Sequence, residues 1–402
     1  MQVRVRTAAT AAALAGSLAL VSACSGAVGN DQQPSATSPG AEPSAVSASS
    51  AVLRTNVKPG TAGVSVDTLV SVTAENTRLS RVTLTGQGSG RVKGAISEDG
   101  ERWVAADRLE PGVRYRLTAT ATTSGGTATQ LKRSFRSQDL TLDEQTYPSI
   151  APLDGETVGV GMPVIVTFDV PVKNRAEFER HLTVTASPAQ PGSWHWLSDS
   201  EVHWRPKSYW KPGTTVTVDA DLNGVKAGNG VYGQEDRVSR FRVGDAVIVR
   251  TDVANHQMLV FRNGDLLRTI PISAGKPGFT TRSGIKVIIE KFRSKTMDAA
   301  TTGISPGDPE YYNISDVEYA QRLTYSGEFI HAAPWSVGDQ GSANVSHGCV
   351  GMSTENAAWL YSVTKRGDVV DVTGTDRPME PTNGYGDWNV PWKDYKAASA
   401  LS

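Results

Sequence analysis

Two cysteines occur in this chain of 402 residues, at positions 24 and 349. Cys24 ends an N-terminal segment with the features of an export signal, so Cys349 has no partner for an internal disulfide. Cysteines outside the cytoplasm ordinarily form disulfides, and a lone thiol there is either buried and inert or reactive by purpose. Cys349 ends the sequence Ser346-His347-Gly348-Cys349, with a second histidine, His331, upstream. These neighbours favour a reactive thiol.

A nucleophilic cysteine needs a base within reach of its sulfur. His347 and Cys349 face the same side of an extended segment, but the distance from ring to sulfur would be long. His331, at the end of the predicted strand 328–331, is the better candidate because it arrives from another strand. Gly348 allows the backbone to approach a substrate closely, and the amides around Cys349 can point at a developing oxyanion.

One short helix is predicted after the reactive segment. Ser353 is its expected N-cap, Lys365-Arg366 end it, and Gly367 lies just past the end. The segment 346–352 would run directly into the N-terminus of this helix. Since the positive end of a helix dipole stabilises negative charge, we expect a favoured thiolate at Cys349.

The fold class is predicted to be mainly β. Trp103 is followed by Pro111-Gly112 and an alternating strand pattern, and the same arrangement recurs 101 residues later at Trp204 and Pro212-Gly213. Short strands separated by glycine and proline, in units near 100 residues, indicate immunoglobulin-like sandwiches. They are placed at about 52–140 and 145–243. A β-rich catalytic domain at 244–374, with a hairpin at Asn263-Gly264, and a C-terminal extension at 375–402 complete the organisation.

The N-terminus predicts export and membrane attachment. Arg4 and Arg6 precede an uncharged run that is too short for a comfortable membrane span and indicates a signal peptide over residues 1–24. Val21-Ser22-Ala23-Cys24 resembles the lipobox of bacterial lipoproteins, which implies acylation of Cys24; a plain secretory signal cut near Ala23 is the alternative. Residues 25–51, rich in Ser, Ala, Pro and Gly, predict a disordered tether. We expect a lipid-anchored protein on the extracytoplasmic face of the membrane that reaches towards the cell wall.

Charge and histidine positions exclude other classes of partner. The net charge is −1 and there is no basic block, so no nucleic-acid partner is expected. His181, His195 and His203 all fall in the second sandwich, where they suggest either a metal or sugar site or an aromatic-lined strand pair with partly exposed histidines. We favour the second interpretation, because no carboxylate or cysteine lies at ligand spacing. No metal is predicted.

A resemblance to a known family becomes specific at the reactive segment. His331, fourteen intervening residues and Ser346-His347-Gly348-Cys349 match the signature of the L,D-transpeptidases (the YkuD type), the cysteine enzymes that cross-link bacterial peptidoglycan. Actinobacterial lipoprotein members are similar along three further stretches, and they carry two immunoglobulin-like domains, a β-rich catalytic domain and a C-terminal extension that packs on it. The three stretches are Phe329–Gly338, Lys365–Val370 and Gly386–Trp392.

The resemblance implies roles for individual residues. Cys349 would be the nucleophile and His331 its base, with His347 and Gly348 shaping the site. Tyr325 would line the pocket and donate to the oxyanion. Residues implied in substrate binding are Met297, Tyr325, Ser346 and Gly351, and the stretch 298–324 resembles a lid. Plain lining roles remain the alternative for Met297 and Tyr325.

The C-terminal tail and two departures from the family pattern need separate interpretations. Trp388 and Trp392 are interpreted as aromatic anchors of the C-terminal tail. Two residues depart from the family pattern: Gly351 stands where an asparagine is usual, and Ala332 where close relatives often have a serine that orients the histidine. Both changes loosen hydrogen bonding around the site. A different residue or a backbone carbonyl must then hold the neutral tautomer of His331.

The implied reaction is acyl transfer through a thioester on Cys349 without any cofactor. Peptidoglycan stem tetrapeptides would serve as donor and acceptor, terminal D-Ala would leave, and a 3→3 cross-link would form. Carbapenem-type β-lactams would acylate the same cysteine. Two alternatives remain open: an L,D-carboxypeptidase or wall-attachment transferase with the same acyl-enzyme, and a catalytically silent wall-binding lipoprotein.

Overall fold

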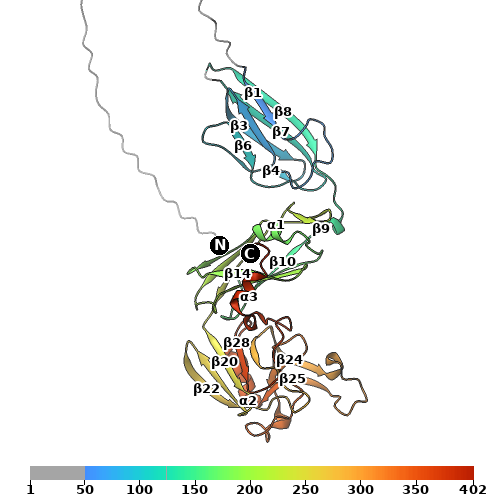
Figure 1. Cartoon of the computed structure of the whole chain (residues 1–402), viewed down its shortest axis with the longest axis vertical. Coiled ribbons are helices and arrows are strands. Elements are labelled where there is room, and N and C mark those ends of the chain that lie inside the picture. The colour runs from blue at the N-terminus through green and yellow to red at the C-terminus, as the bar shows by residue number, and fades with distance from the viewer. Residues whose placement is uncertain (1–49, 124) are drawn as a thin grey trace, which may run out of the picture. The chain divides into compact units, whose positions relative to one another are not determined.

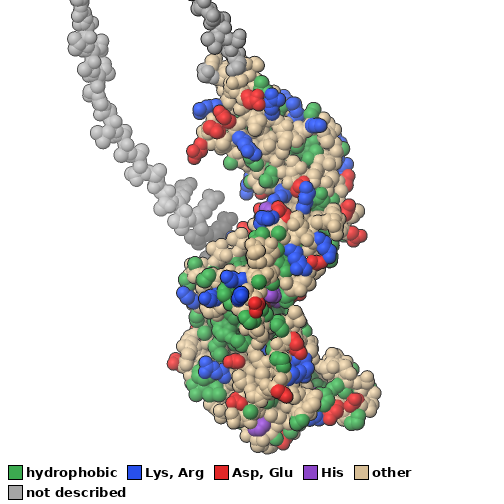
Figure 2. All heavy atoms as spheres, in the orientation of Figure 1, with side chains coloured by type: hydrophobic (Ala, Val, Ile, Leu, Met, Phe, Trp, Pro, Cys, Tyr) green, Lys and Arg blue, Asp and Glu red, His purple; other side chains and the backbone are tan. Residues whose placement is uncertain are grey.

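The computed structural model describes residues 50–123 and 125–402 (Figure 1). The predicted signal peptide with Cys24, and the predicted tether up to residue 49, lie outside these residues. The fold is mainly β, as predicted: two immunoglobulin-like sandwiches precede a β-rich domain that contains Cys349. Among the described residues, no helix is both long and apolar enough to cross a membrane. On the face that Figure 2 shows, basic and acidic side chains are interspersed.

The first sandwich consists of two four-stranded sheets that enclose a common apolar core. Alternate residues of each strand point inward: a valine and an alanine in β2, and a tyrosine, a leucine and two alanines in β7. One sheet has the order β1 (Val52–Thr55), β2 (Ser71–Glu75), β6 (Arg102–Ala105), β5 (Gly94–Ile96). The other has the order β4 (Gly90–Val92), β3 (Arg78–Gly86), β7 (Arg114–Thr122), β8 (Ala128–Arg136).

The second sandwich has the same plan, with additions at one end. Its sheets are β10 (Pro148–Ala151), β12 (Val164–Phe168), β15 (Glu201–Pro206), β14 (Gly192–Ser198), and β11 (Thr157–Val158), β19 (Arg237–Val243), β16 (Thr215–Ala220), β13 (Leu182–Ser187). The additions are η1 (Leu142–Glu144), helix α1 (Arg175–Arg180) and the small sheet β17 (Lys226–Gly228), β18 (Val231–Gly233), β9 (Gln145–Thr146). Helix α1 was not expected from the sequence.

The repeat seen in the sequence corresponds to a structural repeat. Trp103 and Trp204 are both buried, and each lies in the third strand of its four-stranded sheet. Gly112 and Gly213 have φ values of 68° and 79°, a left-handed conformation that favours glycine, so the Pro-Gly pairs are turns that lead into the next long strand.

The third domain places two sheets around the core that supports Cys349. The five-stranded sheet is β22 (Asp265–Pro271), β21 (Gln257–Arg262), β20 (Val247–Asp252), β28 (Val369–Thr373), β23 (Gly284–Val287). The four-stranded sheet is β24 (Glu290–Asp298), β25 (Asn313–Arg322), β26 (Phe329–Ala332), β27 (Val350–Met352). The Asn263-Gly264 turn joins β21 and β22 with positive φ at both residues, as predicted.

The predicted helix exists and begins as expected, but it ends earlier than predicted. Helix α2 spans Thr354–Val363, and Ser353 caps it by accepting a hydrogen bond from the Asn356 N–H. It ends before Lys365-Arg366, because Thr364 is already extended. The segment 346–352 runs directly into the N-cap Ser353, as predicted, but its last three residues form strand β27, which lies between Cys349 and the helix.

The C-terminal extension packs on the second sandwich as well as on the third domain. The Trp388 Nε1–H donates to the Gly161 carbonyl at 2.7 Å, and the Arg205 guanidinium lies 4.6 Å from the Trp388 ring and 5.2 Å from the Trp392 ring. These contacts agree with the interpretation of both tryptophans as tail anchors. The extension contains η4 (Asp387–Asn389) and helix α3 (Trp392–Ala397).

Two of the three histidines of the second sandwich, His195 and His203, serve this packing. His203 is 1% exposed, and its ring lies between Asp387 (Nδ1 to Oδ1, 2.9 Å) and Glu201 (Nε2 to Oε1, 2.8 Å). The expectation of a partly exposed histidine is therefore wrong for His203, because its main partner comes from 184 residues away. His195 donates from Nδ1 to the Tyr395 carbonyl at 3.0 Å. The described residues contain no cluster of three potential metal ligands.

Removing the carboxylate of Asp387 is expected to weaken this attachment in a pH-dependent way. Despite burial, Asp387 and Glu201 raise the pKa of His203 to about 9, so its ion pairs stabilise the fold fully below 6.5 and lose their contribution as pH rises through about 9. Asp387→Asn should lower the free energy of unfolding by about 3 kcal/mol near pH 6.5. It should also flatten the decline in stability towards pH 9.

Urea unfolding followed by tryptophan fluorescence at both pH values measures this effect. Asp394→Asn makes the same chemical change on the exposed surface of α3 and serves as the matched control. If the free energy of unfolding depended on pH equally in wild type and Asp387→Asn, the raised pKa of His203 would not arise from its pair with Asp387.

Candidate active site

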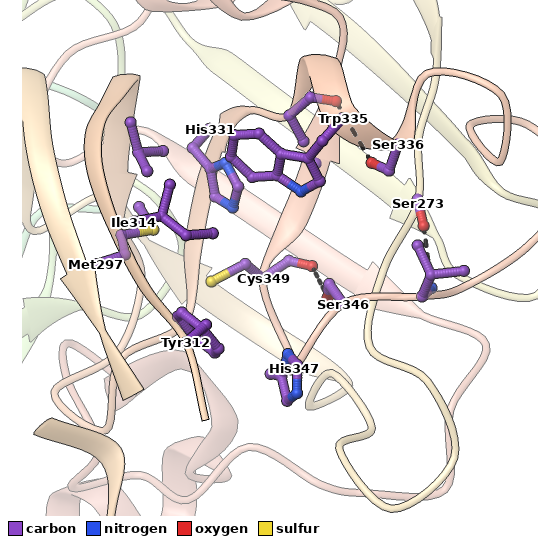
Figure 3. A pocket seen from close by; sticks show the side chains of 14 residues that line it. Ser273, Met297, Tyr312, Ile314, His331, Trp335, Ser336, Ser346, His347 and Cys349 are labelled. Atoms are coloured by element: carbon purple, nitrogen blue, oxygen red, sulfur yellow. Dashed lines mark hydrogen bonds between the residues drawn. The ribbon is translucent and has the colours of Figure 1, made fainter. Parts of the chain in front are cut away.

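Parallel pairing of β26 with β27 brings His331 and Cys349 to one cavity. His331 lies opposite Gly351 in the register, two residues beyond Cys349. Figure 3 shows the Cys349 sulfur and the His331 imidazole directed into this cavity, which has a volume of about 190 Å³. Further lining residues are Ser273, Met297, Tyr312, Ile314, Val317, Ala333, Trp335, Ser336, Val345, Ser346, His347 and Gly351.

His331 has the geometry of a neutral base. Its Nδ1–H donates to the Ala332 carbonyl at 2.7 Å, and the lone pair of Nε2 is left for a substrate or thiol proton. The ring is 6% exposed, and burial lowers its pKa below 6.5. A backbone carbonyl thus holds the neutral tautomer of His331. This is one of the two arrangements expected because Ala332 replaces the serine of close relatives.

Cys349 is a thiol in this structure, so the expectation of a favoured thiolate is wrong. The residue is 8% exposed, and burial raises the pKa of its thiol to about 12. The helix dipole that was expected to oppose this effect acts within about one turn of the helix end, and β27 lies between Cys349 and α2. The thiol instead contacts the Gly327 carbonyl at 3.6 Å. Nucleophilic attack by this sulfur therefore requires a base.

Ser346 and Gly348 shape the loop that carries the thiol. The Ser346 hydroxyl donates to the Cys349 carbonyl at 2.6 Å and accepts from the Gly348 N–H at 3.1 Å. Gly348 has a φ of 120°, which glycine adopts without strain, and its carbonyl accepts from Thr281 Oγ1 at 2.9 Å. Since the Gly348 N–H is engaged, it is not free to bind an oxyanion, as the amides around Cys349 were expected to do.

His347 is held by its own set of partners rather than by the sulfur. Its Nε2 lies 2.7 Å from Glu310 Oε2, and its ring lies 4.6 Å from Phe279 and 4.9 Å from Tyr312. Glu310 also pairs with Lys276 at 2.5 Å. His347 thereby connects the Cys349 loop to the segment between β24 and β25.

That segment is only partly the lid expected at 298–324. It begins with η2 (Ala299–Thr302) and continues as a loop to Tyr312, but β25 occupies its second half. Residues 313–322 form a strand rather than a loop because they pair with β24 along their length, and Gln321 and Arg322 pair with β26 as well.

Cys349 also lines a second cavity, of about 150 Å³. Met297, Tyr312 and Cys349 line both cavities, whereas Tyr325, which is 53% exposed, lines only the second. The sequence analysis missed Tyr312. Tyr312 lies just before β25, the strand that pairs with the strand of Met297. This position could have indicated Tyr312 from the sequence, but only if the pairing of β24 with β25 had been known.

Tyr312 lines the same cavities as the sulfur and carries a hydroxyl that can donate a hydrogen bond there. Burial first, and then the charge of Cys349, raise the pKa of this hydroxyl to about 12, so it stays protonated at neutral pH. The sequence analysis expected Tyr325 to be the hydrogen-bond donor to the oxyanion. In the structure Tyr312 lines both cavities, whereas Tyr325 lines only the second.

Gly351 lies on the cavity floor in close contact with a neighbour. A Cβ added at this position would meet the Ala333 Cβ at 2.8 Å, below the normal contact distance. Gly351→Ala is therefore expected to lower the free energy of unfolding by about 1–3 kcal/mol. Thermal unfolding measures the loss, and the double variant Gly351→Ala/Ala333→Gly should recover most of it. An unchanged unfolding temperature in Gly351→Ala would contradict the packing described here.

Comparisons with known proteins agree with this architecture. A family model for the bacterial Ig domain matches residues 61–226, and a model for the L,D-transpeptidase catalytic domain matches residues 246–372. The chain is 40% identical to L,D-transpeptidase 2 of Mycobacterium tuberculosis over 87% of its own length and 85% of that protein. It is 35% identical to L,D-transpeptidase 5 of the same species over 83% of its length and 73% of that protein.

A solved structure is also similar over more than half of this chain. It is described as an LD transpeptidase in complex with imipenem, and it shares 38% identity with this chain. The match has a TM-score of 0.50 and covers 56% of this chain and 97% of that structure.

Proposed function

This chain belongs to the L,D-transpeptidase family, a family of acyltransferases, and we propose that it forms 3→3 cross-links between peptidoglycan stems through a thioester on Cys349. The observation that carries the proposal is the cavity shared by the Cys349 thiol and the neutral His331 imidazole. A buried thiol with a raised pKa is unreactive alone, and a neutral base beside it supplies the missing proton transfer.

The first half of the proposed reaction acylates Cys349. Its sulfur attacks the carbonyl on the L-centre of the third, diamino acid residue of a tetrapeptide stem while Nε2 of His331 takes the thiol proton. The C–N bond to the terminal D-Ala then breaks, and His331 returns the proton to the leaving amine. The N–H of Cys349 and the hydroxyl of Tyr312 are proposed to stabilise the oxyanion of the tetrahedral intermediate.

The second half transfers the acyl group to an amine. The side-chain amine of a neighbouring stem attacks the thioester carbonyl, His331 accepts its proton, and the thiolate leaves and is reprotonated. Cys349 lines two cavities, with volumes of about 190 and 150 Å³, and this supports separate places for donor and acceptor.

The test is to incubate the purified full chain with disaccharide tetrapeptide and analyse the products by mass spectrometry. A dimer formed with loss of one alanine, whose fragments place the link between two third residues, would support the proposal. Tripeptide without dimer would assign an L,D-carboxypeptidase instead, and unchanged substrate would favour the silent wall-binding protein.

Two associated proposals concern the membrane and inhibitors. Cys24, outside the described residues, is proposed to carry the lipid that anchors the chain on the extracytoplasmic face; partition of wild type but not Cys24→Ala into a detergent phase tests this. Carbapenems are proposed to acylate Cys349, and the relative described with imipenem supports the idea. Intact-protein mass spectrometry should show one adduct, and an adduct on Cys349→Ala would contradict it.

A further inference from the structure

One sheet of the first sandwich has a basic outward side. Its strands β4, β3, β7 and β8 lie side by side in this order (Figure 1). Alternate residues of these strands point into the apolar core, so the residues between them point outward. We call the six cations at these outward positions the basic face: Arg81, Arg91, Arg114, Arg116, Lys132 and Arg136.

Strand pairing makes these cations neighbours across the sheet. Arg114 lies directly opposite Arg136. Arg91 and Arg116 lie on either side of Thr85, which pairs with both. Because the cations alternate with core residues along each strand, they form no basic block in the sequence. The strand register therefore creates the basic face.

The basic face has few counter-charges. Strands β3, β4, β7 and β8 contain no aspartate or glutamate. Among the described residues, Arg136 alone of the six cations forms an ion pair, with Asp139 at 2.6 Å; the Asp139 side chain is 76% exposed, so solvent screens it. Arg78, at the start of β3, lies against the acidic loop 98–101 and is not counted. Like charges opposite each other destabilise a sheet, so an anionic partner would stabilise this arrangement.

A hollow lies at the end of the basic face where β7 begins and β8 ends. The Arg136 side chain is held there, because its Nε–H donates to the Gly112 carbonyl at 3.1 Å. Two arginines at one hollow supply the charge and the hydrogen-bond donors that bind a phosphate group. The hollow has a volume of about 380 Å³ and is lined by Gln87, Gly112, Val113, Arg114 and Arg136.

The first sandwich differs in charge from the rest of the chain and follows the predicted tether. Residues 50–140 contain 13 lysines and arginines and 8 aspartates and glutamates, whereas the whole chain has a net charge of −1. The predicted tether, residues 25–51, would span about 30 Å root-mean-square as a flexible chain. A lipid on Cys24 would therefore keep this cationic domain close to the membrane surface.

We propose that the basic face docks the first sandwich on a membrane surface that contains anionic phospholipids, with one phosphate headgroup in the hollow between Arg114 and Arg136. The choice of a membrane over other anionic surfaces rests on the proposed lipid at Cys24. Among the described residues, no large apolar side chain is exposed on these four strands. Docking is therefore electrostatic and does not insert side chains into the bilayer.

Co-sedimentation with vesicles tests the proposal. Residues 25–402 include every described residue but neither the predicted signal peptide nor Cys24, so no lipid contributes to binding. They should bind vesicles of equal parts phosphatidylglycerol and phosphatidylcholine, and not vesicles of phosphatidylcholine alone. Raising NaCl from about 0.05 to about 0.5 M should release the protein. Equal binding to both kinds of vesicle, or binding to neither, would overturn the proposal.

Two double variants separate the basic face from the overall charge of the domain. Arg81→Gln/Arg116→Gln should weaken binding to the anionic vesicles by about 20- to 30-fold, since each cation near such a surface contributes about fivefold. Arg54→Gln/Arg102→Gln removes the same charge from exposed positions of the other sheet and should change binding by less than about threefold. Equal weakening in both would overturn the proposal. Thermal unfolding checks that each variant is folded.

Purified peptidoglycan sacculi are the competing anionic surface. Binding to sacculi that depends on Arg81 and Arg116, together with no binding to vesicles, would overturn the proposal and assign the basic face to the wall. Cross-linking of soluble disaccharide tetrapeptide needs neither surface, and both double variants should keep the wild-type rate. A failure of the proposed cross-linking and a failure of docking are therefore separately visible.

Discussion

Cys349→Ala is expected to form no cross-linked dimer, with a loss of activity of about 10⁴-fold or more. The sulfur supplies the covalent bond to the acyl group, and no other side chain of the cavity can replace it: His331 is a neutral base, and the Ser346 hydroxyl donates to the Cys349 carbonyl. Dimer formation from disaccharide tetrapeptide, quantified by chromatography and mass spectrometry, measures the loss.

Two controls separate chemistry from folding in this experiment. Cys24→Ala removes the other cysteine and should leave the rate unchanged in detergent. Thermal unfolding of Cys349→Ala should stay close to wild type, since the substitution removes one atom from a small apolar cluster. Dimer formation by Cys349→Ala at a substantial fraction of the wild-type rate would show that another group is the nucleophile.

His331→Gln is expected to reduce the rate of acylation by about 10²- to 10⁴-fold near neutral pH. Burial raises the pKa of the Cys349 thiol to about 12, so only a minute fraction is thiolate without a base. His331 is a base only when neutral, and burial lowers its pKa below 6.5. The wild-type rate should therefore hold as pH falls to 6.5 and decline only below it.

The variant should show the opposite pH behaviour. Without His331, acylation depends on hydroxide to generate the thiolate, so its rate should rise steadily with pH and show no acidic limb that belongs to a histidine. The rate of adduct formation with imipenem as a function of pH distinguishes the two profiles. An unchanged profile in His331→Gln would assign the base to another residue.

The sequence located the reactive pair but not its electrostatic environment. The spacing of His331 and Cys349 and the Gly348 turn are local features, and they led to residues that the structure brings to one cavity. The thiolate expected from the helix dipole was wrong. Residues 350–352 lie between Cys349 and the helix N-cap, and they form an extended strand because they pair with β26. Pairing between distant strands does not show in local sequence patterns.

Long-range partners explain the remaining misses. Tyr312 reaches the cavity only because β25 pairs with β24. His203 depends on Asp387 across 184 residues. By contrast, the tryptophan and Pro-Gly repeat predicted both sandwiches well, because alternation and turns are local signals.

The departures from the family pattern have local structural answers. Ala332 contributes its carbonyl, which any residue provides, to hold His331. Gly351 leaves the cavity floor without a side chain, and Ala333 fills the adjacent space. Neither residue removes the thiol or its base from the cavity.

The most direct measurement of the central claim is the mass of the protein during reaction with the donor stem alone. Full chain mixed with disaccharide tetrapeptide and quenched in acid should gain the mass of the substrate less one alanine, on the peptide that contains Cys349. Hydroxylamine should remove this adduct, as expected of a thioester. Turnover of the stem with no such adduct on Cys349, or an equal adduct on Cys349→Ala, would contradict acyl transfer through this thiol.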